Sequence, residues 1–389
     1  MLARALSVAL TLAAVAPARA KTEKTLRWEA EVAAGLEYDS NATRLDSDVT
    51  EQGTPVQSGL FRGQGRLAAS YRPASQLVLA ASYDLAGKVF WSERARGQDA
   101  VIHRLTAALG LRLCDGLVAK LGGLYHEGFQ RSPDTFDEPG AGLFAFRMLD
   151  GRLQLAAAPS PGLVAGIAFG ARQFTYKPES ALSFNALLAA LTLESHHTLG
   201  KGKTESELDL AFAYSFSRRV FDSELELLCP EQIPGCAIGE PGQVVTYSYP
   251  GSERVDLLHR LSLEVTWVRG LLVSAGYELG ISRSNSYGLG YQRHEFTAKL
   301  VTPLFWKIYG TLQIRARLLF YEASTVVLDD PGFEEENRSH ALLQLERVLI
   351  NRLRLVVRYT LFVGDLTSPD VASLRHLAYV GLSYRYSSK

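Results

Sequence analysis

The clearest pattern in this chain is a strict alternation of apolar and polar positions near its carboxyl end. Residues 376–386 read HLAYVGLSYRY. One face of an extended stretch here would carry Ala378, Val380, Leu382, Tyr384 and Tyr386, and the other Tyr379, Gly381, Ser383 and Arg385. A period of two predicts a β-strand with two different faces, one of them strongly apolar.

The same alternation recurs from Leu26 to Tyr386 in stretches separated by turn residues. Long and short connections follow each other in turn, which is typical of up-and-down barrels with long external loops and short periplasmic turns. Fourteen or eighteen strands would also fit, but the pattern predicts sixteen, which run approximately over 26–38, 58–71, 77–91, 101–113, 117–130, 140–158, 163–176, 182–194, 205–220, 255–267, 271–281, 291–302, 307–320, 338–348, 353–363 and 374–386.

One stretch leaves the strand count open. Asp150-Gly151 could be a hairpin turn or a bulge within the long stretch 140–158, and treating that stretch as one strand keeps the up-and-down order. The longest insertion is expected at about 221–252, between the ninth and tenth strands.

The first 20 residues have the features of a signal peptide. An early cation, Arg4, precedes an apolar run, and Ala18 and Ala20 flank the expected cleavage site before Lys21. Residues 21–389 then form one domain, and no later run of 18 apolar residues occurs. The chain is therefore expected to be exported.

Composition separates a membrane barrel from a soluble sandwich. With 47% hydrophobic residues and a mean hydropathy of +0.00, the chain is no more apolar than a soluble protein. A barrel with one lipid face and one water face has such a balance, whereas a soluble sandwich has shorter strands with polar outward faces. We expect an all-β, transmembrane, antiparallel up-and-down β-barrel in the bacterial outer membrane.

Charged side chains concentrate on the face that would line the lumen. The arginines singled out there are Arg62, Arg66, Arg104, Arg112, Arg254, Arg260, Arg315, Arg317, Arg354 and Arg358. Ion pairs between neighbouring strands, which stabilise the wall, are the first explanation, and a cationic lining that eases the passage of anions is the functional alternative. The whole chain has 41 basic and 41 acidic residues, so no global field favours one sign of solute.

Aromatic residues near the predicted strand ends suggest interfacial girdles that anchor the barrel in the membrane. These residues are Trp28, Tyr38, Tyr71, Trp91, Tyr176, Trp267 and Trp306.

Reactive side chains give no catalytic or metal motif. Cys229 and Cys236 lie close together in the long loop and are expected to form a disulfide in an oxidising envelope, which leaves Cys114 over. The eight histidines form no spaced metal motif, and no phosphate-binding loop or basic nucleic-acid patch is present. We expect a protein that is not an enzyme, has no cofactor and binds no nucleic acid.

Two segments resemble known families. The end of the chain, with Gly381, Leu382, Tyr384 and Tyr386, resembles the signal read by the barrel assembly machinery, although Ser387-Ser388-Lys389 follows the usual terminal aromatic. The stretch 35–41, GLEYDSN, is similar to the first strand and loop of porin-like barrels of exopolysaccharide loci and of surface lipoprotein assembly modifiers. This resemblance implies a role in transport or secretion, with no catalytic residues.

Two hypotheses of function follow. The first is an outer-membrane conduit, most concretely for export of a polysaccharide or other surface polymer, and otherwise a general porin. The second is a structural barrel without an open pore that anchors an envelope-spanning machine for motility or adhesion. The expected partners are outer-membrane lipid and lipopolysaccharide, the barrel assembly machinery, and periplasmic export or motility components.

Overall fold

The structure of the chain is a computed structural model. It describes residues 25–42, 56–131, 143–177, 180–200, 202, 205–228, 246–287, 289–321, 339–363 and 374–388. The expected signal peptide and the expected Cys229–Cys236 disulfide lie outside these residues. Across the described part of the chain, no helix has the length and hydropathy needed to cross a membrane.

Sixteen strands form one closed antiparallel barrel, so the predicted fold class and strand number are confirmed. The strands are β1 (Thr25–Asp39), β2 (Ser58–Ala74), β3 (Leu77–Phe90), β4 (Ala100–Cys114), β5 (Leu117–Arg131), β6 (Leu143–Ser160), β7 (Leu163–Lys177), β8 (Phe184–Leu199), β9 (Ser206–Leu228), β10 (Thr246–Val268), β11 (Leu272–Ser284), β12 (Tyr291–Pro303), β13 (Ile308–Tyr321), β14 (Ser339–Ile350), β15 (Leu353–Val363) and β16 (Leu374–Ser387).

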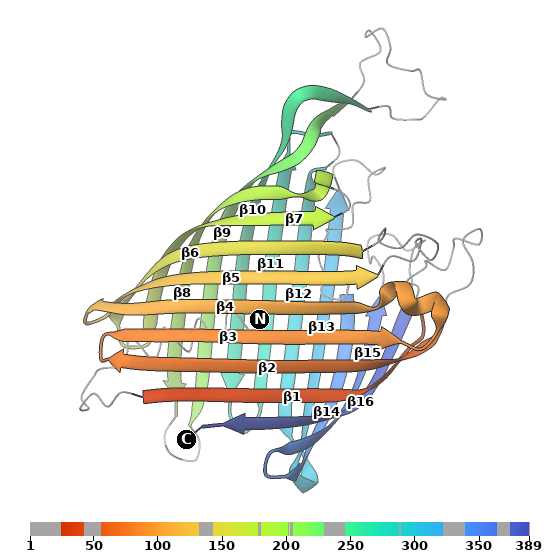
Figure 1. Cartoon of the computed structure of the whole chain (residues 1–389). Coiled ribbons are helices and arrows are strands. Elements are labelled where there is room, and N and C mark those ends of the chain that lie inside the picture. The colour runs from red at the N-terminus through yellow and green to blue at the C-terminus, as the bar shows by residue number, and fades with distance from the viewer. Residues whose placement is uncertain are drawn as a thin grey trace.

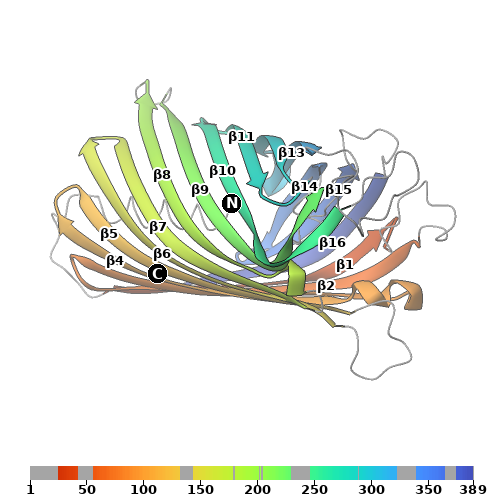
Figure 2. The ribbon, with the colours of Figure 1, turned by 90° about the horizontal axis from the view of Figure 1, so that it is seen from above.

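Each strand pairs with its neighbours in sequence, and β1 pairs with β16 to close the wall. In Figure 1 the strands of the near wall cross those of the far wall at a steep angle, as tilted strands on opposite sides of a barrel do. Figure 2 shows β16 beside β1 from above. The two ends of the sheet therefore satisfy each other, and the wall has no free edge.

Connections of different length separate the two rims of the barrel. Where Thr25 and Ser387 lie, consecutive strands are joined by short turns, such as those after Cys114 and Ser160. Gly116 and Gly162 have φ of 81° and 80° in these two turns, a conformation that glycine adopts without strain. The opposite rim carries the longer connections. Among them are the β3–β4 connection with the short 3₁₀ segment η1 (Glu93–Gln98), the β7–β8 connection with the segment η2 (Ser180–Leu182), and the connection between β9 and β10. We call these the short-turn rim and the long-loop rim.

The structure settles the one open stretch in the strand assignment and corrects the bounds of the long insertion. β6 runs without interruption through Asp150-Gly151, so no hairpin turn forms there. The expected insertion at 221–252 is shorter than predicted, because β9 continues to Leu228 and β10 begins at Thr246. In the sequence, residues 224–227 still alternate between Glu and Leu, and the two strands stay paired across a bulge, beyond their neighbours (Figure 1).

The closing seam between β1 and β16 is built around two glycines. Gly35 and Gly381 face each other on the inward side, and the ring of Tyr379 lies over both. A Cβ on Gly381 would lie 2.1 Å from the Tyr379 hydroxyl and 2.6 Å from the Ala34 carbonyl oxygen. Gly381, part of the predicted assembly signal, is therefore also required by the packing of the seam.

Gly381→Ala is expected to destabilise the closed barrel by about 1–3 kcal/mol, because the added methyl group would overlap backbone as well as the tyrosine. Urea unfolding in lipid vesicles, together with the gel mobility of unheated and heated samples, measures the effect. Gly151→Ala is the control, since a Cβ there meets nothing within 4 Å. Equal unfolding free energies for both variants would show that the seam is not close-packed.

Candidate functional site

The outward face of the barrel is apolar over most of its area. Val32, Leu67, Phe169, Leu187 and Leu263 are all more than half exposed, each at an outward position of its strand. Leu382 and Tyr384 of the predicted assembly signal belong to the same surface, and Tyr386 stacks on Trp28 with ring centroids 4.7 Å apart. Exposed apolar area on this scale requires a lipid environment.

Polar aromatic pairs mark the outward surface toward the long-loop rim. The Tyr214 hydroxyl lies 2.8 Å from His259 Nδ1, and Tyr277 and His294 form the same contact at 2.8 Å. Of the residues predicted for the girdles, Trp28, Tyr38, Trp91 and Trp306 are exposed. Tyr176 is not a girdle residue, because it faces inward and packs on a cluster of phenylalanines.

A closed wall with an apolar outside and charged side chains inside can satisfy its backbone in lipid and keep a polar interior. The chain is an outer-membrane β-barrel. Its possible functional sites are therefore the lumen, the two rims and the lipid-facing wall.

The structure places all ten predicted arginines at positions that alternate with the apolar outward residues, and hence on the inward face. Other inward cations are Arg27, Arg72, Lys88, Lys120, Arg152, Arg172, Arg219, Arg293, Lys299, Arg375 and Arg385. The inward carboxylates on the described strands are Glu29, Glu31, Glu37, Asp39, Asp84, Asp150, Glu194, Glu207, Asp209, Asp256, Glu264, Glu278, Glu295 and Glu346. Cations outnumber carboxylates on this face, although the whole chain is neutral.

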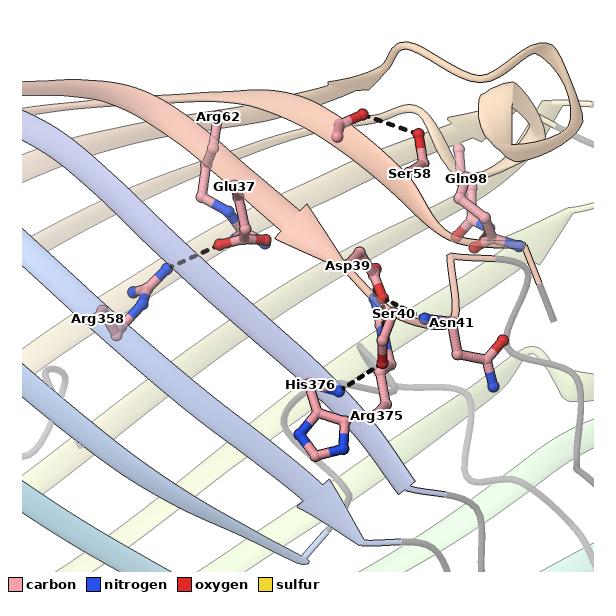
Figure 3. Close-up of polar contacts among 12 residues, drawn as sticks. Glu37, Asp39, Ser40, Asn41, Ser58, Arg62, Gln98, Arg358, Arg375 and His376 are labelled. Atoms are coloured by element: carbon pink, nitrogen blue, oxygen red, sulfur yellow. Dashed lines mark hydrogen bonds and ion pairs between the residues drawn. The ribbon is translucent and has the colours of Figure 1, made fainter.

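Glu37 organises the charged residues beside the closing seam. Its two carboxylate oxygens accept hydrogen bonds from Arg62 at 2.7 Å and from Arg358 at 3.3 Å. Arg358 also lies over the Tyr379 ring, 5.0 Å from the centroid. Figure 3 shows Glu37 between the two arginines, which come from β2 and β15. The carboxylate thus links strands on both sides of the seam.

Asp39 and Arg375 form the most buried ion pair among the described residues, again across the seam. Arg375 donates to both carboxylate oxygens of Asp39, at 2.9 and 2.5 Å, and the side chains are 3% and 0% exposed. The Asn41 backbone N–H also donates to Asp39, at 3.0 Å (Figure 3). This bidentate pair fixes the register of β1 on β16 at the long-loop rim.

Several predicted lining arginines are neutralised by nearby acids. Arg254 donates to Asp256 at 2.6 Å, and Arg315 and Arg354 pair with Glu295 and Glu346 at 3.3 and 3.2 Å. A further cluster centres on Asp150, whose carboxylate accepts from Arg152 and Arg172 at 2.7 Å each. The sequence interpretation missed Asp150 because it was considered as a turn residue, although its alternation with Leu149 places it inside.

Three inward arginines are left with a net positive charge on β9 to β12. Arg260 and Arg293 are both in register with Gly280, which stands between them and has no side chain to separate them. Arg219 and Arg293 both act electrostatically on Arg260, and the nearby carboxylate of Glu278 is hydrogen-bonded by Arg293. The Arg260 side chain makes no hydrogen bond to a residue that the structure describes, and its Nε is buried. We call Arg219, Arg260 and Arg293 the arginine trio.

Aromatic side chains on the inward face pack against each other and do not offer open rings. Phe174, Phe184 and Phe221 are each at most 7% exposed, with neighbouring ring centroids 5.2 and 5.1 Å apart. Arg219 and Arg254 cover the rings of Phe184 and Phe221 at 5.0 and 4.0 Å. Because their faces are covered, these rings stabilise the wall and are not a stacking surface for sugars.

The described residues include a Ser–His pair that is hydrogen-bonded through both side chains, and they include no group of three side chains able to hold a metal ion. Ser195 Oγ lies 2.6 Å from His197 Nε2 on the outward face near the short-turn rim. The adjacent His196 points inward and contacts Asp209 at 2.6 Å, so that carboxylate cannot orient His197. The pair therefore lacks the third group of a catalytic triad within the described strands.

The known structures that resemble this chain have low sequence identity to it. No protein-family model and no curated protein matches the chain. Among solved structures, CdiB from Acinetobacter baumannii has a TM-score of 0.49 at 9% identity, over 94% of this chain and 61% of CdiB. OccAB1 from the same organism has 0.48 at 7%, over 94% and 97%, and an anion-selective porin from Comamonas acidovorans has 0.45 at 10%, over 94% and 100%. The barrel assignment rests on the strand pairing and not on these likenesses.

Arg375→Gln is expected to reduce the free energy of unfolding by about 3–5 kcal/mol, because it leaves the buried Asp39 carboxylate without its cation. Arg385→Gln breaks the Glu29–Arg385 pair, whose side chains are 30% and 48% exposed, and should change stability by less than about 1 kcal/mol. Urea titration in vesicles compares the two. Equal losses would mean that burial does not distinguish the pairs.

Proposed function

We propose that the protein is a non-enzymatic conduit of the outer membrane that favours anionic solutes or acidic polymers. The observation that carries the proposal is the arginine trio, an inward group of three cations. Of the carboxylates near it, Glu278 is bound by Arg293, and Glu295 and Asp256 pair with Arg315 and Arg254. Charge of one sign on the wall of a pore stabilises counter-ions that pass it. A sixteen-stranded wall also has a circumference larger than side chains alone fill.

The remaining luminal charges support the same direction of selectivity. The ion pairs at Glu37, Asp150 and Asp256 neutralise many arginines, so they solvate the wall and contribute little field. The excess of cations over carboxylates therefore resides in the arginines without such partners. An acidic polysaccharide, which carries repeated carboxylates or phosphates, would meet this excess along its path.

Export of a surface polymer is the most concrete form of the proposal, and a general anion-favouring porin is its simpler form. The similarity of residues 35–41 to barrels of exopolysaccharide loci supports export. A barrel that exports a polymer needs periplasmic components that deliver the polymer to its short-turn rim, and we propose such components as partners. The barrel assembly machinery is the partner proposed for insertion.

Replacing Arg260 and Arg293 together by Gln should lower the anion-to-cation permeability ratio by about fourfold per charge removed. This follows from a Coulomb energy of about 0.8 kcal/mol between unit charges ~5 Å apart in water. The reversal potential of the purified full chain in a planar bilayer under a salt gradient measures the ratio. The double replacement by Lys keeps both charges and should retain the wild-type ratio. An unchanged ratio in the Gln variant would contradict the assignment of selectivity to the trio.

Deletion of the gene should abolish or strongly reduce surface polymer if the conduit serves export, and should leave polymer intact if it is a general porin. Polymer on the cell surface is quantified in the deletion strain and in the strain complemented with the wild-type gene. A barrel that shows no channels in a bilayer but co-purifies with periplasmic proteins would instead support the structural anchor and overturn the conduit.

A further inference from the structure

Two arginines on the lipid-facing wall have no partner among the residues that the structure describes. Arg218 of β9 and Arg283 of β11 both lie in register with Leu257 of β10, on the outward face. Both side chains are exposed, and neither forms a hydrogen bond or ion pair with a residue that the structure describes. By contrast, the outward Arg147 pairs with Glu127 at 3.3 Å. Arg218 and Arg283 are therefore open to an anionic group of the surrounding lipid.

The height of these arginines places them at the lipid headgroups. Arg218 is twelve residues from Ser206, the first residue of β9, and Arg283 is eleven from Leu272, the first residue of β11. A strand rises about 3.3 Å per residue and is tilted by about 40°, which puts both side chains about 28–30 Å from the short-turn rim. The apolar band of such barrels is about 25 Å tall. The nearest tyrosine–histidine pair, Tyr214–His259, lies just on the membrane side of them.

A groove on the same outer wall begins at Arg218. It has a volume of about 730 Å³, and Arg218, Asn185 and Gln173 lie at one end of it. Its floor consists of small residues in register across β4 to β7, namely Ala107, Gly123, Gly151 and Ala171. Leu105, Tyr125 and Leu149 form its side toward the long-loop rim. The groove is thus apolar along its length and polar at the end where the cation stands.

A second groove of about 660 Å³ continues the first, because Ala107 and Gly123 line both. It extends over Ala81 to Ala69 of β2, which is only five residues from Ala74 at the short-turn rim. From β2 to β7 the floor crosses five strand spacings, about 24 Å. One leaflet of the hydrocarbon core is about 15 Å thick. The combined groove therefore descends from headgroup level into the apolar band and can hold one acyl chain.

We propose that this surface binds a phosphorylated glycolipid of the external leaflet, of the lipid A type. The Arg218 and Arg283 guanidinium groups contact its phosphates, and one of its acyl chains lies in the groove. A groove on a wall that faces lipid is filled by lipid, and the two cations, which have no partner among the described residues, select an anionic headgroup. Arg218 and Arg283 stand two strand spacings apart, about 10 Å, so their side chains reach one phosphate or two on a single headgroup. Arginine matches phosphate oxygens with two parallel hydrogen bonds.

Native mass spectrometry of the full chain in detergent, titrated with purified bisphosphorylated lipid A, tests the headgroup contact. The Arg218→Gln, Arg283→Gln double variant should bind about tenfold to a hundredfold more weakly than wild type, since hydrogen bonds to charged groups contribute on this scale. The matched control is Arg147→Gln, which removes an outward cation that already has a protein partner and should leave affinity unchanged. Equal affinity of wild type and double variant would overturn the proposal.

Gly151→Leu tests the acyl-chain contact separately. A Cβ at Gly151 meets nothing within 4 Å, so the side chain should enter the groove without disturbing the wall. The variant should keep the heat-dependent gel shift of the folded barrel and bind lipid A several-fold more weakly. Undiminished binding would overturn the placement of an acyl chain in the groove. Phosphatidylglycerol and dephosphorylated lipid A are the competing probes, and binding of either as tight as that of lipid A would overturn the assignment to a phosphorylated glycolipid.

Discussion

Closure of the first strand on the last is the constraint on which the other features of this barrel depend. In lipid an open sheet edge would leave a row of backbone groups without partners, and each such group is costly there. The β1–β16 pairing removes that edge, and its side chains hold it in one register. Tyr379 fits only because Gly35 and Gly381 face each other, and the Asp39–Arg375 pair is buried on the same two strands. Once the register is set, the residues that face each other across neighbouring strands are fixed around the wall.

The inward charges then divide into two groups with different consequences. Pairs such as Glu37 with Arg62 and Asp150 with Arg172 cancel locally and hold neighbouring strands together. The arginine trio is cancelled only in part, because Glu278 pairs with Arg293 while Gly280 leaves Arg260 beside Arg293 without a carboxylate hydrogen-bonded to it among the described residues. A neutral chain thereby acquires a positive patch inside. The field that a passing solute meets depends on which arginines lack a carboxylate, and not on the total charge.

On the outer wall the solvent is lipid, so the side chains that face it are apolar. Large apolar side chains face lipid over most of the surface, and polar groups are confined to the level of the headgroups. Where small residues fall in register on β4 to β7, the wall is hollowed and lipid must fill the space. The outward cations Arg218 and Arg283 stand where a phosphate is the available anion. Lumen and lipid face are thus two recognition surfaces made by one alternating sequence.

The sequence by itself determined the class of fold, the sixteen strands and which face each strand residue occupies, because a period of two is a local property that survives in any register. It also placed the ten lining arginines on the inward face, but it did not determine their partners. Pairing such as that of Arg358 with Glu37, 321 residues apart, depends on which positions of distant strands come into register. The alignment of Ala107, Gly123, Gly151 and Ala171 was not foreseen for the same reason. Tyr176 and Asp150 were misjudged for a local reason, since one was taken as an interfacial aromatic and the other as a turn residue, although alternation along β7 and β6 places both inside. Only the closed tertiary structure brings the four small residues side by side, because register between strands is fixed by closure of the whole wall.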